Sequence, residues 1–193
     1  MSPLRLLLVA ACFLPAAALA APLAEPDLDV GDEPGRVSTQ ETIIEDGPYA
    51  RQMVFFRTTE APGTVIIHTS ERFLYIVQGN NRALRYGIGV GREGFTWAGS
   101  SEITAKREWP DWTPPPEMIA RKPELPRHMP GGPDNPLGAR AMYLGDTLYR
   151  IHGSNEPNTI GTAASSGCIR MTNDDVVDLY NRVKVGTKVV VLR

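Results

Sequence analysis

Cysteine and histidine are the residue types in this chain that could supply nucleophilic chemistry, and both are scarce. The 193 residues include two cysteines, Cys12 in an apolar N-terminal run and Cys168 in SSGCIRM, and three histidines. A thiol is a strong nucleophile only as a thiolate, and a neighbouring imidazole can take its proton. His152 is the best placed of the histidines, because it ends a strand-like run and is followed by Gly153, so its side chain could face a cleft.

The surroundings of Cys168 favour a nucleophile, although other roles stay open. Gly167 precedes it and adds no bulk where a substrate carbonyl must approach, and the backbone N–H groups of Gly167 and Cys168 could form an oxyanion region. A lone cysteine is also found as a small buried apolar residue. Zinc binding is disfavoured, since the chain has no CxxC or HxxxH spacing and a structural zinc takes four ligands. We therefore predict no metal site, and no cofactor is implied, because a thiolate can do this chemistry without one.

The N-terminus has the pattern of a secretory signal peptide. Arg5 is its only charged residue, an apolar stretch follows, and Ala-Leu-Ala at 18–20 forms a small-residue cleavage site. Cleavage there would remove Cys12 and leave Cys168 without a disulfide partner, in a protein exported to a periplasm or a similar cell-envelope space. A lipoprotein site at Cys12 would leave a very short apolar segment before the cysteine, so we favour the signal peptide.

Charge and hydropathy argue against two classes of partner. The formal net charge is −2, and the sequence has no basic run or Lys/Arg-rich helix, so the electrostatic footprint of a nucleic-acid binder is missing. The N-terminal apolar run is shorter than the ~20 residues that span a bilayer, and no later segment looks transmembrane. The oligomeric state stays open.

Composition divides the chain into a signal peptide at 1–20, a flexible linker at 21–50 and one domain at 51–193. The linker is rich in Pro, Asp and Glu and poor in large apolar residues, so it cannot bury much surface. In the domain, alternating or continuous apolar runs predict strands. These runs are 64–69, 73–78, 83–90, 103–106, 139–144, 148–151 and 188–192.

One clear helix is predicted in the C-terminal half. The apolar residues from Val176 to Val183 fall on one face at helical spacing. Thr172 or Asn173 can cap the start of this helix, and Gly186 follows its end. We therefore expect a mainly β fold, a small sandwich or barrel, with this helix packed against it.

Residues 107–138 interrupt this pattern. They hold nine of the 17 prolines, together with Trp109, Trp112 and a Gly-Gly pair. Since proline removes backbone donors, no central strand or helix is expected to run through the segment. A loop of this length in a compact domain is usually functional or disordered, and two tryptophans argue against disorder. We predict an ordered, proline-rich flap over a site, against the alternative of a purely structural extension.

The stretch IHGSNEPNTIGTAASSGCIRM, from Ile151 to Met171, resembles the signature of the L,D-transpeptidase catalytic domain family. That signature is His-Gly-(Ser/Thr), a spacer, then Ser-x-Gly-Cys-(Ile/Val)-Arg, and here 12 residues separate His152 from Ser165. The segments WTPPP and GGPDNPLG of the flap are similar to the stretch that precedes this signature in many proteobacterial members. The resemblance covers roughly 64–193, which would be the motif-bearing core of the domain.

This resemblance implies a β-rich fold that acts on peptidoglycan stem peptides as donor and acceptor. The family's cysteine attacks the peptide bond after the third residue of a stem, forms an acyl-enzyme and releases D-alanine. The acyl group then passes to the side-chain amine of another stem's diamino acid, and carbapenems are expected to acylate the same thiol. Some members link a lipoprotein instead, and some use water, as a carboxypeptidase does. A peptidoglycan-binding module without catalysis is the other alternative, although binding alone would not require a Cys-His pair.

The resemblance also assigns roles by position. Cys168 matches the nucleophile, His152 the general base and acid, and Gly153 the residue whose backbone carbonyl orients the imidazole. Gly167 lies at the oxyanion region. The residues expected to contact substrate are Ser165, Ser166, Arg170 and Trp112. Arg170 would contact a carboxylate or else form a structural ion pair, and Trp112 would cover the donor stem or else only pack.

Two positions depart from the family pattern. Ser166 stands where many members have histidine, which changes the contacts available to the oxyanion or the acceptor. Trp97 replaces the proline of a Thr-Pro-x-Gly turn, so the family pattern does not give the geometry of that turn.

Overall fold

The computed structural model describes residues 47–95 and 97–193. The predicted signal peptide at 1–20, with Cys12, and most of the predicted linker lie outside these residues. In chain order the elements are β1 (Gln52–Phe55), β2 (Val65–His68), β3 (Phe73–Gly79), β4 (Arg82–Gly87), β5 (Val90–Gly91), β6 (Gly99–Glu108), α1 (Pro116–Arg121), β7 (Arg140–Leu144), β8 (Arg150–His152), the 3₁₀ turn η1 (Pro157–Thr159), β9 (Ala163–Ser165), β10 (Ile169–Arg170), α2 (Asn173–Arg182) and β11 (Lys188–Leu192).

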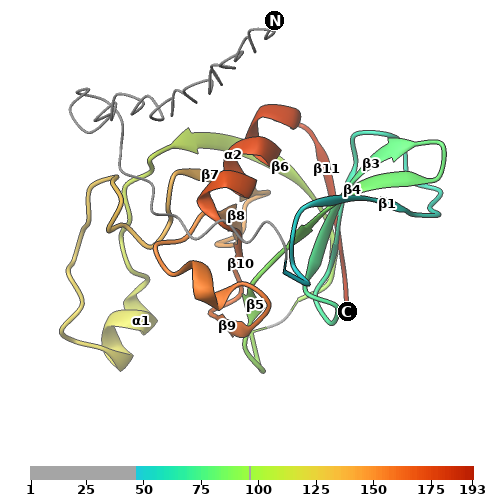
Figure 1. Ribbon diagram of the computed structural model, residues 1–193. Coiled ribbons are helices and arrows are strands. Elements are labelled where there is room, and N and C mark those ends of the chain that lie inside the picture. The colour runs from blue at the N-terminus through green and yellow to red at the C-terminus, as the bar shows by residue number, and fades with distance from the viewer. Residues whose placement is uncertain (1–46, 96) are drawn as a thin grey trace, which may run out of the picture. The chain divides into compact units, whose positions relative to one another are not determined.

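Nine of the strands form one sheet in the order β1-β4-β3-β2-β11-β6-β7-β8-β10, and β5 and β9 form a separate pair. Most neighbours in the large sheet are antiparallel, whereas β11 runs parallel to β2 and β10 runs parallel to β8. Figure 1 shows β1, β3 and β4 on one side of the domain and the segment with α1 on the other. The C-terminal strand β11 lies between β2 and β6, so it joins the N-terminal strands to those that carry the candidate site.

The large sheet curls until its edge strand β10 meets the residues after β4. Gly89 and Arg170 exchange two backbone hydrogen bonds of 2.9 Å each. Apolar side chains from both halves of the sheet then pack into one core, which includes Tyr86, Met142 and Leu179. The predicted mainly β, barrel-like fold is therefore confirmed.

The helix predicted in the C-terminal half is α2. The Thr172 hydroxyl accepts a hydrogen bond from the Asp175 N–H at 3.2 Å, so Thr172 is the N-cap. The Asn173 side-chain oxygen accepts from the Ala139 N–H at 2.9 Å. The start of α2 thus fixes the entry of the chain into β7.

The single strand predicted at 83–90 is wrong, because this segment is broken into β4 and β5. The break lies at Ile88 and Gly89, where the chain passes from the large sheet to the small one. A side chain at Gly89 would place its Cβ 2.9 Å from the carbonyl oxygen of Thr159. Glycine is therefore required at this crossing, and the apolar pattern alone does not reveal the interruption.

No central strand or helix runs through 107–138, as expected, but the segment is not free of regular structure. Strand β6 continues to Glu108, and α1 forms a six-residue helix that begins at Pro116. Proline is tolerated in the first turn of a helix, because the N–H that it lacks would have no intrahelical partner there. From here on, the flap denotes residues 109–138.

Residues 47–50, at the end of the predicted linker, contact the domain. The Tyr49 carbonyl accepts from the Gly87 N–H at 3.2 Å, and the Tyr49 hydroxyl donates to the Gly161 carbonyl at 3.4 Å. Added Cβ atoms at both glycines would collide with Tyr49. The packed part of the chain therefore includes residues before 51.

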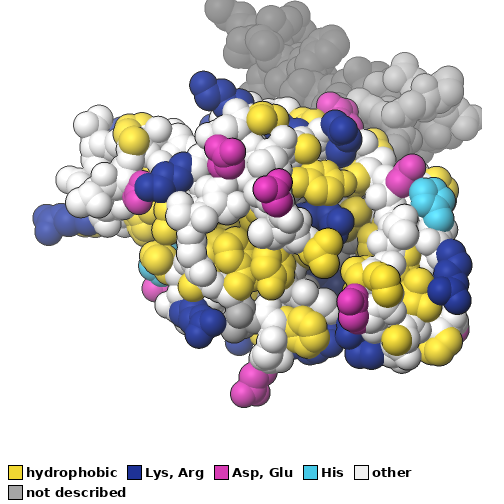
Figure 2. Space-filling view, turned by 180° about the vertical axis from the view of Figure 1, so that it is seen from behind, with side chains coloured by type: hydrophobic (Ala, Val, Ile, Leu, Met, Phe, Trp, Pro, Cys, Tyr) yellow, Lys and Arg dark blue, Asp and Glu magenta, His cyan; other side chains and the backbone are white. Residues whose placement is uncertain are grey.

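The surface carries charges of both signs. On the face shown in Figure 2, Lys and Arg side chains are interspersed with Asp and Glu around patches of apolar side chains. Within residues 47–95 and 97–193, no helix has the length and apolar character needed to cross a membrane.

Candidate active site

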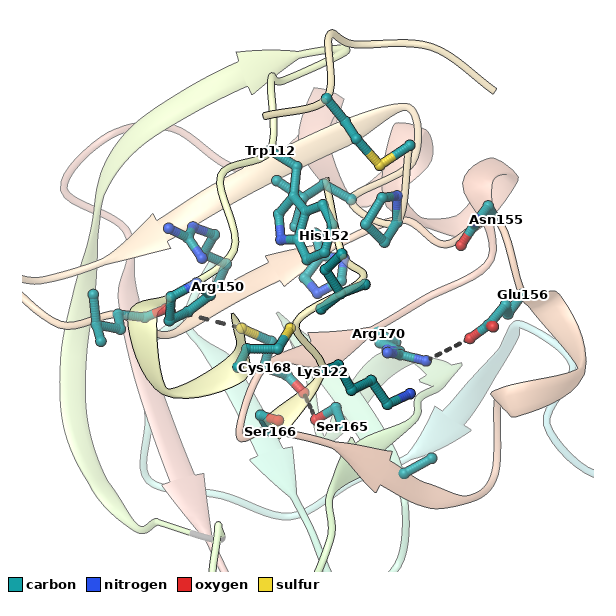
Figure 3. A pocket seen from close by; sticks show the side chains of 18 of the residues that line it. Trp112, Lys122, Arg150, His152, Asn155, Glu156, Ser165, Ser166, Cys168 and Arg170 are labelled. Carbon is teal, nitrogen blue, oxygen red and sulfur yellow. Dashed lines mark hydrogen bonds and ion pairs between the residues drawn. The ribbon is translucent and has the colours of Figure 1, made fainter. Parts of the chain in front are cut away.

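A cavity of about 1060 Å³ opens between β8, the turn before β10 and the flap. Figure 3 shows that its labelled residues converge on one space from the flap, from β8 and the residues after it, and from β9, the following turn and β10. The lining includes Trp112, Met118, Arg150, His152, Ser165, Ser166, Cys168 and Arg170. A cavity of this size can take a peptide.

His152 is the last residue of β8 and is buried. Its Nδ1 lies 2.6 Å from the carbonyl oxygen of Gly153. A carbonyl only accepts, so Nδ1 carries the proton and Nε2 is left as the acceptor. Burial lowers the pKa of His152 to about 4, the Gly153 hydrogen bond opposes this, and the charges of Arg170 and Arg150 add to the lowering. The imidazole is therefore neutral at pH 7.

Cys168 is partly exposed to the cavity and has a free thiol. Its Sγ–H donates to the carbonyl oxygen of Leu148 at 3.8 Å, and among the described residues no hydrogen bond joins Sγ to the His152 ring. Loss of solvation where the protein covers the sulfur raises the pKa of the Cys168 thiol. Hydrogen bonds and charge from Arg150, and the charge of Arg170, oppose that rise. The resting site therefore holds a neutral thiol and a neutral imidazole in one cavity.

The turn that presents Cys168 is held by Ser165. The Ser165 hydroxyl donates to the Cys168 carbonyl at 2.6 Å and accepts from the Gly167 N–H at 3.2 Å. The Gly167 N–H is thus occupied, whereas the Cys168 N–H has no hydrogen-bond partner among the described residues. Gly167 has a φ of 105°, and a Cβ there would lie 2.5 Å from the Tyr149 ring, so only glycine fits this turn.

Trp97 contacts the same turn through its indole. Its Nε1–H donates to the carbonyl oxygen of Gly167 at 3.3 Å. The indole also stacks on the Tyr149 ring, with the centroids 4.8 Å apart and the planes 9° from parallel. The proline that the family pattern has in this region offers no such donor, so the departure at Trp97 adds a contact to the turn that carries the thiol.

Arg150 and Arg170 bring two positive charges to the cavity. Arg150 lies two residues before His152 on β8, so both side chains leave the same face of the strand. Arg170 forms an ion pair of 3.1 Å with the exposed carboxylate of Glu156, drawn as a dashed line in Figure 3. For Arg170 the sequence left two roles open, a contact to a substrate carboxylate and a structural ion pair. The ion pair with Glu156 is present in the structure.

The flap forms the opposite side of the cavity and is ordered by hydrogen bonds at its base. Trp112 and Met129 exchange two backbone hydrogen bonds of 2.8 Å each. Asn135 is 1% exposed, and its Nδ2 donates to the carbonyls of Pro110, Met129 and Pro130 at 3.1, 3.3 and 2.9 Å. Asn135 therefore supplies donors to a proline-rich segment that is short of them.

Comparison with known proteins identifies the family. The model of the YkuD L,D-transpeptidase catalytic domain matches residues 62–191. This chain belongs to the L,D-transpeptidase catalytic domain family. The recognition of the signature between Ile151 and Met171 is thereby confirmed.

Individual relatives agree with this assignment. The chain is 38% identical over 149 residues to the probable L,D-transpeptidase ErfK/SrfK of Escherichia coli, with 73% of this chain and 47% of that protein covered. It is 36% identical over 146 residues to the probable L,D-transpeptidase YbiS of the same organism, with 72% and 47% covered. The chain thus spans about half the length of these curated relatives.

Two solved structures share the fold. A Brucella melitensis protein, described as a probable carnitine operon oxidoreductase CaiA, is 50% identical, covers 79% of this chain and 99% of its own, and has a TM-score of 0.51. That description differs from the family name, and the membership of this chain rests on the family model and the curated relatives. L,D-transpeptidase 3 of Mycobacterium tuberculosis with a faropenem-derived adduct is 15% identical, with 69% and 61% covered and a TM-score of 0.53, which shows the fold alone.

The structure gathers the site residues predicted for this L,D-transpeptidase family member. The residues that line the cavity are His152, Ser165, Ser166, Cys168, Arg170 and Trp112. Gly153 and Gly167 hold the backbone positions beside the histidine and the cysteine. Within the described residues, no group of three or more His, Cys, Asp or Glu could hold a metal ion.

Three residues around the thiol were not predicted as site residues. Arg150 could have been found, because period-two alternation on a strand that ends at His152 places it on the same face. Trp97 was singled out only as a departure from the family pattern. Tyr149 gives no signal in the sequence, because its contact depends on the left-handed turn at Gly167.

Proposed function

We propose that this protein is a peptidoglycan L,D-transpeptidase in which Cys168 is the nucleophile and His152 the general base and acid. The observation that carries the proposal is that both residues line one cavity, while the Gly153 carbonyl holds Nδ1 and leaves Nε2 of His152 to accept a proton. Family membership supports the type of reaction.

In the acylation step, Nε2 of His152 takes the proton of the Cys168 thiol, and Sγ attacks the carbonyl carbon of the third residue of a donor stem. The tetrahedral intermediate collapses, the peptide C–N bond breaks, and His152 returns the proton to the departing amine of D-alanine. The product is a thioester on Cys168. This step requires one residue to attack and another to transfer the proton. The cavity contains both, Cys168 and His152.

In the second step the side-chain amine of an acceptor stem attacks the thioester carbonyl. His152 takes a proton from that amine, the C–S bond breaks, and the proton returns to Sγ of Cys168. Water would follow the same route and give a carboxypeptidase, and the amine of a lipoprotein would give a protein linked to peptidoglycan. We place the stem amine first, because the relatives are named as transpeptidases.

The oxyanion of both intermediates is assigned to the Cys168 N–H. This donor has no partner among the described residues, whereas the Gly167 N–H is bonded to Ser165. In a trans peptide the C=O and N–H point in opposite directions. By holding the Gly167 carbonyl, Trp97 keeps the Cys168 N–H turned the other way, so it acts as a positioning residue for the oxyanion.

Arg150 is assigned to the stabilisation of the thiolate. Its guanidinium and its backbone lower the pKa of the Cys168 thiol against the effect of burial. A positive charge beside the sulfur favours the charged form most strongly when substrate has displaced water from the cavity. The thiolate is then formed during proton transfer to His152 rather than in the resting enzyme.

We also propose that the chain is exported. Peptidoglycan lies outside the cytoplasmic membrane, and the N-terminal 20 residues have the pattern of a cleaved signal peptide. The catalytic domain would then include residues 47–50 as well as the expected 51–193, because Tyr49 packs on it, and the linker would lie before residue 47. N-terminal sequencing of the protein recovered from the cell envelope tests this, with residue 21 expected first and an intact N-terminus counting against it.

The decisive experiment for the reaction incubates purified protein with a disaccharide-tetrapeptide, with and without an acceptor stem. We expect a cross-linked product and free D-alanine by mass spectrometry, and no product from Cys168→Ala that keeps the fold. Tripeptide in place of the cross-link would identify a carboxypeptidase. Binding to sacculi with neither product would identify a binding module and overturn the proposal.

A second test uses the thiol directly. A carbapenem should give a stoichiometric acyl adduct on the intact protein by mass spectrometry, and Cys168→Ala should give none. An adduct of the same mass on the variant would remove the role assigned to Cys168. A β-lactam adduct is described for the Mycobacterium tuberculosis relative, which motivates the choice of probe.

A further inference from the structure

A recess of about 200 Å³ opens from the side of the active-site cavity. Its lining residues also line the large cavity, except for Arg92, which lines only the recess. The lining consists of Arg92, Met118, Arg121, Lys122, Leu125, Ala164, Ser166 and Arg170. Four of these residues are basic and none is acidic, so we name it the basic recess.

The charges of the basic recess are largely uncompensated. Arg170 is paired with Glu156 at 3.1 Å. Among the described residues, Arg92, Arg121 and Lys122 form no ion pair. Three cations with no counter-charge among residues 47–95 and 97–193 thus lie in one recess of a chain whose net charge is −2. Such a cluster repels itself and is stabilised by a bound anion.

Contacts other than ion pairs hold two of these cations in place. The guanidinium groups of Arg92 and Arg121 both lie over the ring of Phe95, at 4.3 and 5.7 Å from its centroid. Arg92 also donates to the Ser166 hydroxyl at 3.5 Å. Ser166 directly precedes Gly167 and the nucleophile, so the recess is connected to the turn where the chemistry takes place.

We propose that Arg92, Arg121 and Lys122 of the basic recess bind a carboxylate of a peptidoglycan stem next to the reacting bond. This inference rests on the proposed function, because it takes the ligand of the cavity to be a stem peptide. A guanidinium presents paired N–H groups that match a carboxylate, and Lys122 adds a point charge. Donor and acceptor stems both carry carboxylates, so the chemistry of the ligand is the same for either.

The recess also gives a reason for serine at position 166. Its hydroxyl accepts from Arg92, and its small side chain leaves the recess open between Arg92 and Arg170. A histidine at this position would add a ring to the lining of the recess. In this chain Ser166 therefore accepts from Arg92 without placing a ring in the recess.

The test compares stem peptides that differ only by a carboxamide in place of one carboxylate, taken position by position. Steady-state kinetics are measured for the native protein, for Arg92→Gln, Arg121→Gln and Lys122→Gln, and for the triple variant. Arg127→Gln is the matched control, because Arg127 is exposed on the same flap and lines neither cavity. Circular dichroism shows that each variant keeps its fold.

We expect one carboxylate position at which the triple variant raises KM at least about tenfold, with a smaller rise for each single variant. The corresponding carboxamide should have a high KM with the native protein and show no further loss with the triple variant. The control should behave as the native protein does. An equal loss for carboxylate and carboxamide, or no loss at any position, would overturn the proposal.

Two arms of the experiment assign the carboxylate to a stem. With the donor varied at fixed acceptor, a change in KM places the carboxylate on the donor, and the reverse arrangement places it on the acceptor. Calorimetry of a stem tripeptide with Cys168→Ala keeps the recess separate from the reaction. If the native protein forms no product and the triple substitution still weakens tripeptide binding, the proposed function is wrong. The role of the recess in binding a carboxylate is then still supported.

Discussion

The two sides of the active-site cavity are built in different ways. On the sheet side, β8 and the turn before β10 carry His152 and Cys168, and backbone hydrogen bonds tie these segments to neighbouring strands. On the flap side, α1 and the proline-rich loop around it supply Trp112 and two cations of the basic recess, Arg121 and Lys122. Most flap residues are exposed or half-buried, and Asn135 at its base is one of the few that are buried.

This difference indicates that the two sides of the cavity have different roles. Reacting atoms must be held to within a fraction of an ångström, which a sheet does better than a loop. Binding of a long substrate in its ground state tolerates larger shifts of the binding residues, and such residues commonly lie on loops. Changes on the sheet side should therefore act mainly on kcat, and changes on the flap side mainly on KM.

The largest effect is expected from removing the thiol. Cys168→Ala should lower kcat by at least about 10⁴-fold, because no other described side chain can form the thioester. Product formation by mass spectrometry measures this loss. The melting temperature should stay close to that of the native protein, and turnover within tenfold of native would show that the sheet side does not carry the nucleophile.

The next largest effect should come from the imidazole. His152→Gln removes the proposed base for the thiol proton, and kcat should fall by about 10² to 10⁴-fold. His128→Gln is a matched control, because His128 is exposed on the flap. Equal effects from the two substitutions would contradict the proposed contrast between the sheet and the flap.

The low pKa of His152 predicts an unusual acid limb. Burial places this pKa at about 4, so the neutral base persists at pH 5 and is lost only as the pH falls through about 4. An imidazole with the ordinary pKa of about 6.5 would be roughly 30-fold less available at pH 5. The pH profile of kcat/KM for cross-linking measures this. A limb centred near 6.5 would mean that His152 is not buried in the working enzyme.

A smaller effect on kcat is expected from the indole of Trp97. Trp97→Phe keeps an aromatic ring to stack on Tyr149 but removes the donor to the Gly167 carbonyl. Since the oxyanion donor itself stays in place, kcat should fall about tenfold, less than the loss seen when such a donor is removed. Trp109→Phe, at an exposed position of the flap, is the control and should leave kcat as it is.

The smallest effect is expected at the base of the flap. Asn135→Ala leaves three backbone carbonyls without their donor, which should destabilise the flap by about 1–3 kcal/mol. KM for the stem should rise about fivefold, with a smaller change in kcat. Hydrogen exchange of the flap should increase, whereas exchange in β8 should not. Asn181→Ala, exposed on α2, is the control for the substitution type.

The sequence predicted the large elements of the fold because their signals are local. Apolar runs gave β2, β3, β7 and β11, and the amphipathic pattern gave α2. Strands β5, β9 and β10 have only two or three residues each and show no periodicity of their own. Their positions are set by distant partners, such as the pairing of Gly89 with Arg170. Local sequence patterns cannot predict pairings between residues so far apart in the chain.

The same distinction applies to the candidate site. Cys168, His152 and Gly153 lie in a signature whose spacing is readable in the sequence. The stack of Trp97 on Tyr149 and the gathering of basic side chains in the recess depend on how distant loops meet. The sequence could show that Ser166 is unusual, but its partner Arg92 becomes visible only in three dimensions.

The pairing of Gly89 with Arg170 has a consequence for how the chain becomes reactive. In the parallel register of β8 and β10, His152 lies opposite Arg170, two residues beyond Cys168. Cys168 therefore reaches its place only after β10 has joined both β8 and Gly89, contacts that close long loops of the chain. In a newly made, unfinished chain, Cys168 and His152 are therefore not yet held in one cavity. If the proposed mechanism holds, reactivity toward substrate is thus acquired together with the completed fold, and thioester formation on Cys168 would measure completion of the fold.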